Sequence, residues 1–211
     1  MKTLSEMTTG KQVLQGPIFK GIDKICGKDD LRPIFKGAYI TEGKIVATDA
    51  HHLVEIDLKL FGIDQEGKND LENKFIDTDI LIELSKLKKD QYYFINNEGF
   101  HLVRSGTSKI SRSYPVYDIS DTGNYPKYKN IIPDGALVPI DTFNVSAKLL
   151  LNIQNVFDNI SLFEGATINS KINTYGANKA LLVINKEIVI DKEYTIFERD
   201  FLGLLMPCKV D

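Results

Sequence analysis

The chain has 211 residues, of which 43% are hydrophobic and 26% are charged. This composition is typical of a folded globular protein and excludes disorder along the whole chain. Lysine and arginine total 26 against 29 aspartates and glutamates, a formal net charge of −3, so the chain lacks the basic balance of a typical sequence-specific DNA binder. Any contact with nucleic acid should therefore use a local patch of cations.

The ends and the cysteines of the chain indicate its compartment. The opening MKTLSEMTTGKQ has no apolar core of a secretory signal, and no window approaches the ~18 apolar residues of a membrane span. Cys26 and Cys208 are far apart and outside any metal-ligand spacing. We expect a cytoplasmic protein with two reduced thiols, no membrane contact and no zinc site.

Residues 16–28 are predicted to form a short helix, because isoleucines recur at helical spacing and lysines repeat every fourth residue on another face. The residues concerned are Ile18, Ile22 and Ile25, and Lys20, Lys24 and Lys28. Residues 34–58 alternate β-branched or aromatic residues with polar ones around the turn signal Glu42-Gly43, which predicts three antiparallel strands. The acidic stretch 62–73 is predicted to be a polar linker.

A similar order of elements follows. Residues 74–76 are predicted to be a strand, and residues 77–89 a helix that Asp77 can cap. This helix would carry the cations Lys86, Lys88 and Lys89. Further strands are predicted at 91–97, 100–106 and 111–118.

After a second linker, 122–135, the pattern returns with a strand at 136–140 and a helix at about 145–157. The helix is predicted to face inward with Ala147, Leu150, Leu151 and Phe157. The remaining predicted strands are 160–163, 171–175, 180–184, 187–191, 193–197 and 202–206.

The chain thus repeats a strand, helix and strands module about three times, with a period of roughly 70 residues. Repeats of this size are typical of duplicated supersecondary units that share a sheet. The predicted class is α+β, dominated by antiparallel sheet.

Candidate catalytic residues are few. Asp49, His51 and His52 form a short cluster that could bind a metal or supply a general base. In an extended strand, however, Asp49 and His51 share one face and His52 lies on the other, so a surface or binding-edge role is favoured. The sequence has no nucleophile elbow, Walker run or dinucleotide fingerprint. We expect a protein that is not an enzyme and has no cofactor.

Four strings in order resemble the bacterial DNA polymerase III β subunit, the sliding clamp. Residues 31–58 resemble its central domain, with Thr48-Asp49-Ala50-His51-His52-Leu53 at the place of a T-D-G-H-R-L motif. The other three strings are NYPKYKNIIP at 124–133, FNVSAKLLLNI at 143–153 and LLMPCKV at 204–210. The glycine of the motif is Ala50 here, and its arginine is His52.

The resemblance implies a DNA-clamp fold of repeated βαβββ units, with antiparallel sheets outside and helices on one face. Residues 1–132 would form a domain like the central domain of the clamp, and 133–211 a partial domain like the later half of the last one. The first domain and half of the third have no counterpart, so closure of a ring does not carry over from the family. Association into a homo-oligomer through strand edges is expected.

The resemblance also implies two binding sites. Clamps bind partner peptides in a groove, and the positions that match its lining are Phe35, Thr48, Ala50, His51, Leu53, Pro126, Ile131, Leu204, Met206, Pro207 and Cys208. Sequence-independent contact with duplex DNA would use cations of the helix face. These are Lys20, Lys24, Lys28, Arg32, Lys86, Lys88, Lys89 and Lys148. The groove leucines and Ile131 can alternatively be core residues of the sheets.

The first functional hypothesis is a clamp-like processivity factor of DNA replication or repair that tethers partner proteins, such as a polymerase or repair protein, to DNA. The alternative is a clamp-fold adaptor or competitor that binds partner peptides without encircling DNA. An enzyme that uses Asp49 and the histidines ranks third.

Overall fold

The structure is a computed structural model. It describes residues 11–13, 16–63, 65–88, 90–104, 106–107, 109–119, 125–133, 136–138, 144–164, 170–174, 179–185, 188–190, 194–196 and 201–206.

The first half of the described chain contains two units of similar order. The first unit comprises β1 (Lys11–Val13), η2 (Gly16–Phe19), α1 (Ile22–Ile25), η3 (Pro33–Phe35), β2 (Gly37–Thr41), β3 (Lys44–Thr48) and β4 (His52–Asp57). After η4 (Leu58–Phe61) and α2 (Gln65–Leu71), the second unit comprises β5 (Lys74–Asp77), α3 (Thr78–Leu84), β6 (Gln91–Asn96), β7 (Gly99–Arg104), β8 (Ile110–Pro115) and β9 (Tyr117–Asp118).

The later half contains a third unit. Its elements are η6 (Tyr128–Ile131), α4 (Ala147–Glu164), β10 (Ser170–Asn173), β11 (Leu181–Asn185), β12 (Ile188–Ile190), β13 (Tyr194–Ile196) and β14 (Phe201–Leu205). The strand expected at 136–140 is reduced, within the described residues 136–138, to one pairing, in which the Val138 N–H donates to the Thr174 carbonyl at 2.9 Å. Among the described residues, strands β12 and β13 pair with each other and with no further strand.

The first two units exchange their first strands. Strand β1 pairs with β6 of the second unit, and β5 pairs with β2 of the first. The resulting sheets have the orders β1-β6-β7-β8 and β10-β11-β14-β4-β3-β2-β5-β9. Because each unit completes the sheet of the other, these two units are built to fold together as one body.

The third unit joins the first through the long sheet. Strand β14 pairs antiparallel with β4, with Leu204 opposite Leu53 and Phe201 opposite Ile56. All the ladders of both sheets are antiparallel, so the predicted α+β class is confirmed. The domain boundary expected at residue 132 falls just after η6, and it stays a prediction.

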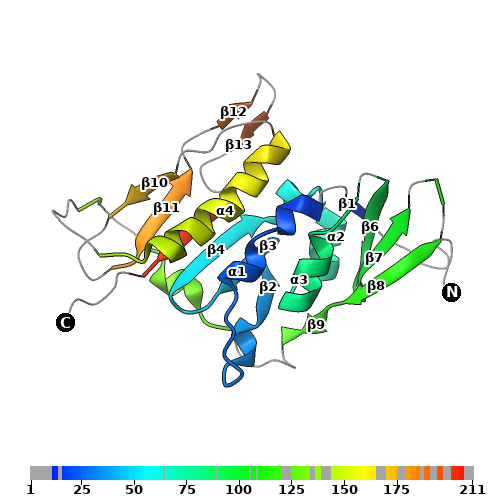
Figure 1. The fold of residues 1–211 in the computed structure, drawn as a ribbon, viewed down its shortest axis with the longest axis horizontal. Helices are drawn as coiled ribbons and strands as arrows, with labels where there is room; N and C mark the ends of the chain where they lie inside the picture. The colour runs from blue at the N-terminus through cyan, green and yellow to red at the C-terminus, as the bar shows by residue number, and fades with distance from the viewer. Residues whose placement is uncertain are drawn as a thin grey trace.

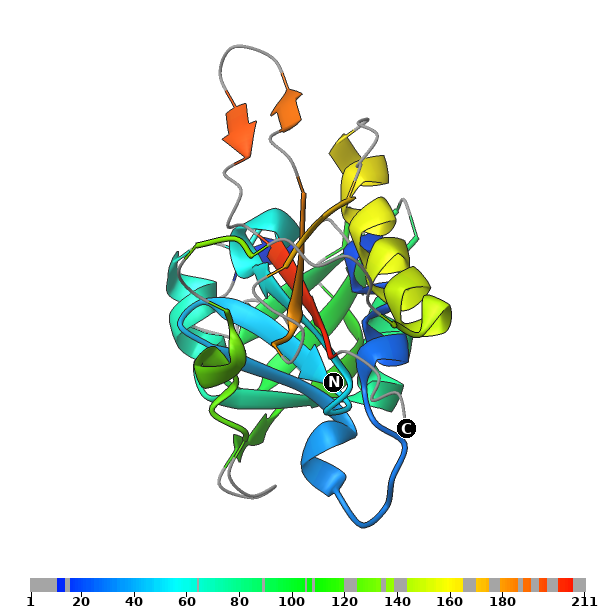
Figure 2. The same cartoon turned by 90° about the vertical axis from the view of Figure 1, so that its left-hand side faces the viewer.

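The helices α1, α3 and α4 lie on one face of the sheets, while η6 lies on the opposite face of the long sheet (Figures 1 and 2). The main core is on the helix face, where Phe19 packs against Phe61 and Phe100 at ring-centroid distances of 4.7 and 5.8 Å. Burial of this apolar surface is the main stabilising contribution to the fold. The two faces of the long sheet therefore differ: one is covered by the helices and the main core, and the other carries η6.

Two predicted helices are shorter than expected. The helix of residues 16–28 is interrupted at Gly21, whose φ of 94° is left-handed, and it splits into η2 and the single turn α1. The helix expected to reach residue 89 ends at Leu84, where the Tyr93 hydroxyl donates to the carbonyl of Leu84 at 3.3 Å. Its predicted cap is confirmed, since the Asp77 side chain accepts from the Asp79 N–H.

Three other predictions of local structure were wrong. The stretch 62–73 is not only a linker, because it contains α2, which buries Leu71 fully. The strand expected at 160–163 belongs to α4, which runs on to Glu164. On that helix Phe157 is buried as expected, but Ala147 is exposed and Leu151 is 57% exposed, because the buried positions Ile153, Val156, Phe157 and Ile160 define a different stripe.

Candidate functional site

The outer face of the long sheet carries a small apolar cluster next to a cleft. The buried members of the cluster are Val46, Leu53, Tyr128, Ala180 and Leu204, with Ile132 and Met206 packed against them. A cleft of about 250 Å³ opens above this cluster and is lined by Asn130, Ile131, Ile132, Pro133, Lys179, Ala180 and Met206. Its volume is below the roughly 300–1,000 Å³ of small-molecule pockets, so it suits one or two side chains.

Hydrogen bonds fix the chain that forms one wall of this cleft. The Tyr128 hydroxyl donates to the Glu55 carboxylate at 2.7 Å, and Lys44 also pairs with this buried carboxylate. Burial raises the pKa of Tyr128, and the adjacent Glu55 carboxylate raises it further. The neutral phenol therefore remains a donor at any ordinary pH and holds η6 against the sheet.

The residues expected to line a peptide groove are divided by the structure. Ile131, which is 46% exposed, and Met206 both line the outer cleft. Leu53 and Leu204 are buried in the apolar cluster beneath it, and Thr48 is buried as well. The alternative role in the sheet core therefore applies to the two leucines but not to Ile131.

The other expected groove residues lie elsewhere. Phe35 and His51 line a second cleft, described below. Ala50 and Pro126 are exposed and line neither cleft. Pro207 and Cys208 lie outside the described residues.

The turn between β3 and β4 is organised by Asp49. Its carboxylate accepts from the backbone N–H groups of His51 and His52, at 2.8 and 2.9 Å, and meets the His52 ring Nδ1 at 2.7 Å. Burial of Asp49 raises its pKa, but these hydrogen bonds outweigh burial and lower the pKa overall. Ala50 adopts a φ of 75° here, a conformation that costs an L-residue energy and that glycine adopts freely.

His52 connects this turn to the third unit. The His52 side chain is 1% exposed, and its Nε2 lies 3.3 Å from the Asn152 Nδ2 on α4. If Nδ1–H donates to Asp49, Nε2 is free to accept from the Asn152 amide. The Asp49 and His52 pair is thereby linked to the third unit through Asn152. The expectation that His52 faces away from Asp49 was wrong because the two residues flank the turn between β3 and β4 instead of lying in one strand.

A second and larger cleft lies at the junction of α1, α4 and this turn. It has a volume of about 560 Å³, and its lining is rich in cations. The lining residues are Lys24, Cys26, Gly27, Lys28, Asp29, Arg32, Phe35, Asp49, His51, His52, Lys148, Leu149 and Asn152. Within the described residues Lys28 and Lys148 pair with no carboxylate, whereas Lys24 pairs with Asp23 at 3.0 Å.

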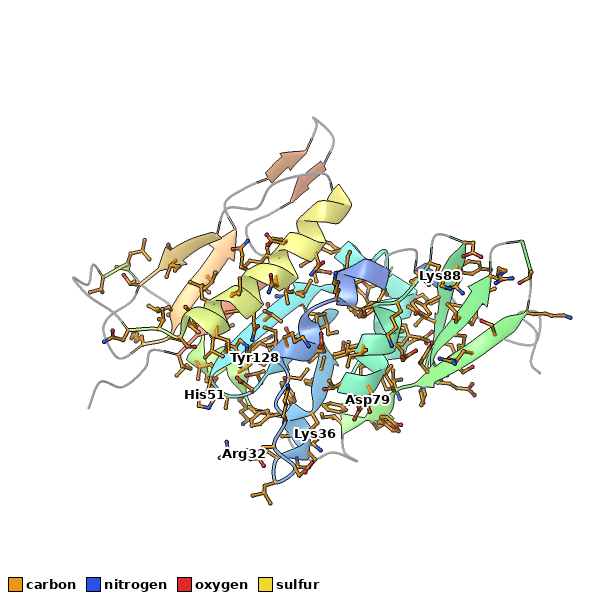
Figure 3. The ribbon with its side chains drawn as sticks, in the orientation of Figure 1. Arg32, Lys36, His51, Asp79, Lys88 and Tyr128 are labelled. Atoms are coloured by element: carbon orange, nitrogen blue, oxygen red, sulfur yellow. The ribbon has the colours of Figure 1, made fainter. Side chains whose placement is uncertain are left out.

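The cations expected to contact DNA do not all converge. Lys24, Lys28, Arg32 and Lys148 line the larger cleft. Lys88 lies beside the four-stranded sheet, well away from Arg32 and Lys36 (Figure 3). Lys86 and Lys88 follow α3 rather than lying on it, and Lys89 is outside the described part. Lys20 lies between η2 and α1 and is exposed.

The described residues offer little for covalent or metal chemistry. Burial raises the pKa of Cys26 to about 12, so its thiol is protonated at neutral pH and is a poor nucleophile. Among the described residues no group of three or more His, Cys, Asp and Glu side chains could hold a metal ion. No helix in the described ranges is long and apolar enough to cross a membrane.

Sequence reasoning missed several residues of both clefts. Ile132 and Pro133 belong to the string NYPKYKNIIP without matching the expected groove lining, and Lys179 and Ala180 directly precede β11. Asn152 could not be found from the sequence, since its contact with His52 joins residues a hundred positions apart. No local signal marks a contact of that range.

The fold is that of the bacterial DNA sliding clamps. The chain superposes on the Bacillus subtilis clamp with a TM-score of 0.55 and 16% identity, covering 100% of this chain and 66% of that one. The C. crescentus β clamp gives a TM-score of 0.60 and 14% identity, with 96% of this chain and 66% of that chain covered. The Helicobacter pylori β clamp bound to a DNA ligase peptide gives a TM-score of 0.57 and 13% identity, with 97% and 67% of the two chains covered.

The clamp-like fold implied by the sequence motifs is thus confirmed. The chain spans 65% of the length of the Borrelia burgdorferi clamp and 66% of the B. subtilis one. No protein-family model and no curated protein sequence matches the chain.

Proposed function

We propose that this protein is a non-enzymatic, sliding-clamp-like accessory factor of DNA replication or repair, which tethers a partner protein to DNA in the cytoplasm. The observation that carries the proposal is the placement of two different clefts on opposite faces of one sheet. The basic cleft lies among the helices, where a clamp fold faces duplex DNA, and the apolar cleft lies on the outer face.

The outer cleft suits a short linear peptide of a polymerase or repair protein. Ile131 and Ala180 supply aliphatic walls, and Met206 supplies an adaptable one. The H. pylori clamp with a comparable fold was solved bound to a DNA ligase peptide, which supports a peptide as the ligand class. Residues of the sequence-based groove that lie in the core, such as Leu53, would support the cleft from below.

The test of the peptide site is the substitution Met206→Asp. Fluorescence anisotropy with labelled peptides tiled over a bacterial DNA ligase should detect binding to the parent protein and none to the variant. Because Met206 is only partly buried, the thermal midpoint should change little. The matched control is Leu151→Asp, which places the same charge at an exposed leucine of the helix face and should leave binding intact.

Intact binding by a well-folded Met206→Asp variant would remove the cleft assignment. Failure of the parent protein to bind any tiled peptide would remove the peptide-binding function itself.

The alternative function is a clamp-fold adaptor or competitor that binds partner peptides without encircling DNA. It is favoured by the net charge of −3. Light scattering alone and with circular DNA separates the two. A higher-mass assembly that stays on circular DNA and is released when the DNA is linearised supports the clamp, whereas a monomer that never associates with DNA supports the adaptor.

A further inference from the structure

The loop between α1 and η3 presents a leucine to solvent. The side chain of Leu31 is 89% exposed, more than any other large hydrophobic side chain of the described residues. The loop projects from the lower edge of the molecule in both views (Figures 1 and 2). A single exposed leucine is common on protein surfaces, so its backbone and its charged neighbours decide whether it can serve as a contact.

Hydrogen bonds organise the backbone of this loop. The Asp29 carboxylate accepts from the Leu31 N–H at 2.9 Å, and the Asp29 carbonyl accepts from the Arg32 N–H at 3.1 Å. At the base of the loop the Gly27 N–H donates to the Phe35 carbonyl at 2.7 Å. A Cβ atom added at Gly27 would lie 2.8 Å from Phe35 Cβ, so the two ends of the loop are in close contact. An apolar side chain on a loop that is already organised loses less conformational entropy on binding.

The charged residues of the loop favour a polyanion as the partner. Lys28 and Arg32, which flank the leucine in the sequence, both line the basic cleft. The two carboxylates of the loop are each paired with a cation of the same segment, Asp29 with Arg32 at 3.9 Å and Asp30 with Lys36. Proteins that bind the minor groove of DNA combine such cations with an apolar side chain inserted between base pairs. Duplex DNA therefore matches this loop better than an apolar pocket of a protein does.

We propose that Leu31 is a wedge that enters duplex DNA between neighbouring base pairs, and that it retains the protein at sites where base stacking is already weakened, such as a mismatch. The inference rests on the proposed association with DNA and deepens it. The cations of the basic cleft would contact the phosphate backbone without reading sequence, and the leucine would add a preference for a distorted duplex.

The cost of separating stacked bases gives this preference its direction. Insertion of an apolar side chain requires two base pairs to unstack, and the cost is lowest where a base is mismatched or damaged. On an intact duplex the leucine would remain outside the stack, so the protein could still move along DNA. At a mismatch the leucine would enter and lose its contact with water, which favours the bound state.

The experiment compares short duplexes of one sequence, with and without a central thymine–thymine mismatch. We expect fluorescence anisotropy to show that the parent protein binds the mismatched duplex roughly three- to ten-fold more tightly, because the mismatch removes part of the unstacking cost. A 2-aminopurine base beside the mismatch reports insertion directly. Its fluorescence should rise when the parent protein binds, since this base is less quenched when it is unstacked.

The variant Leu31→Ala should bind the two duplexes equally and give no rise in fluorescence. Its salt dependence on the intact duplex should be that of the parent, because no cation is changed. Leu31→Ile retains an apolar wedge and should keep the preference. The matched control Leu151→Ala shortens an exposed leucine of α4 and should also keep it. Both positions are exposed, so unchanged thermal midpoints serve as a check of folding.

Equal affinity of the parent protein for the two duplexes would overturn the wedge while leaving the association with DNA in place. A preference for the mismatch that persists in Leu31→Ala would overturn the role of Leu31. A preference without a rise in 2-aminopurine fluorescence would overturn insertion between base pairs. Weaker binding of ligase peptides by Leu31→Ala, with DNA binding unchanged, would assign the loop to a protein partner instead. Absence of any association of the parent protein with DNA would overturn the proposed tethering to DNA and this inference together.

Discussion

Glu55 is a carboxylate buried in the middle of a sheet, on strand β4, and it is 3% exposed. Buried carboxylates are costly unless they are paired and hydrogen-bonded. Here Lys44 supplies the opposite charge and Tyr128 supplies a hydrogen bond. This network fastens the η6 segment, and with it the wall of the outer cleft, to the first unit.

The substitution Tyr128→Phe removes the hydroxyl and leaves one oxygen of the Glu55 carboxylate without this donor. Removing the partner of a buried polar group costs about 1–3 kcal/mol. We expect the free energy of unfolding in urea to fall by about this amount. The control Tyr117→Phe changes a tyrosine that is 44% exposed and should alter stability little; an equal decrease in both variants would contradict the network.

Asp49 should make the stability of the protein depend on acid pH. Burial raises the pKa of its carboxyl, but hydrogen bonds from His52 and His51 together outweigh burial, so the pKa in the folded state lies below the value of 3.8 for a free side chain. A lowered pKa means that the stabilisation is present above the unfolded pKa and is lost as the pH falls through the folded one. The contribution of Asp49 is therefore complete at neutral pH.

We expect Asp49→Asn to be less stable than the parent at pH 7, and the difference to shrink below pH 4. Urea unfolding midpoints at pH 7, 5 and 3 measure this change. As a comparison, Asp90→Asn alters a carboxylate that is more than half exposed and should show no such convergence. A constant gap between the parent and Asp49→Asn at all pH values would contradict the titration of Asp49.

Among the elements, α4 depends on close contact with β14. A Cβ atom added at Gly203 would lie 2.5 Å from Ile153 Cγ2 and 3.4 Å from Phe157 Cζ. The absence of a side chain at this position lets the helix approach the strand, and Phe157 then packs against Phe201 with tilted rings at a centroid distance of 4.7 Å. This contact holds the helix of the third unit on the long sheet.

The substitution Gly203→Val should overpack this contact and destabilise the protein by roughly 1–3 kcal/mol. Urea unfolding of the single variant, of Ile153→Ala and of the double variant forms a cycle that isolates the clash. We expect the second substitution to recover part of the stability, because it vacates the space that the valine needs. Strictly additive effects would show that the two side chains do not compete for one site.

The lengths of the elements illustrate the limits of local patterns. The spacing of Ile18, Ile22 and Ile25 correctly identifies inward-facing residues, all fully buried, but it does not reveal the left-handed Gly21 that divides the helix. The apolar residues of 160–163 favour a strand when considered alone, whereas in the structure they belong to α4, which runs to Glu164. Tertiary packing overrides weak propensities in such short segments.

At the scale of the whole molecule, the charge is distributed unevenly rather than being basic overall. The net charge is −3, yet four of the cations expected at DNA surround one cleft on the helix face. Against these four cations the lining holds only two carboxylates, Asp29 and Asp49, and Asp29 pairs with Arg32 at 3.9 Å. The cleft is therefore a local patch of positive charge.

Reversal of Lys24, Lys28 and Lys148 to glutamate should weaken DNA association and flatten its dependence on salt. The slope of log K against log salt should fall by about 0.9 for each phosphate that the variant no longer neutralises. Anisotropy with labelled duplexes of two unrelated sequences measures the slope and checks that no sequence preference changes. The control Lys86→Glu with Lys88→Glu alters cations outside the cleft and should keep the slope; an equal effect of both sets would contradict a DNA site at the cleft.

The sequence by itself determined the class of this protein, the order of its units and their family likeness. These properties reside in local alternation and in short motifs such as residues 48–53 and 124–133. It also named Ile131 and Met206, which the structure brings together at one cleft. Alternation and short motifs are properties of neighbouring residues, so they can be recognised without knowing which distant segments of the chain are in contact.

Only the tertiary structure decided which of the expected residues meet. The exchange of β1 and β5 between units, the pairing of β14 with β4 and the contact of His52 with Asn152 all join segments far apart in the chain. Such contacts follow from packing and register, which bury Leu53 and Leu204 and assign Phe35 and His51 to a different cleft from Ile131. A motif shows which side-chain types are present, and the packing and register of the sheets determine on which face those side chains lie.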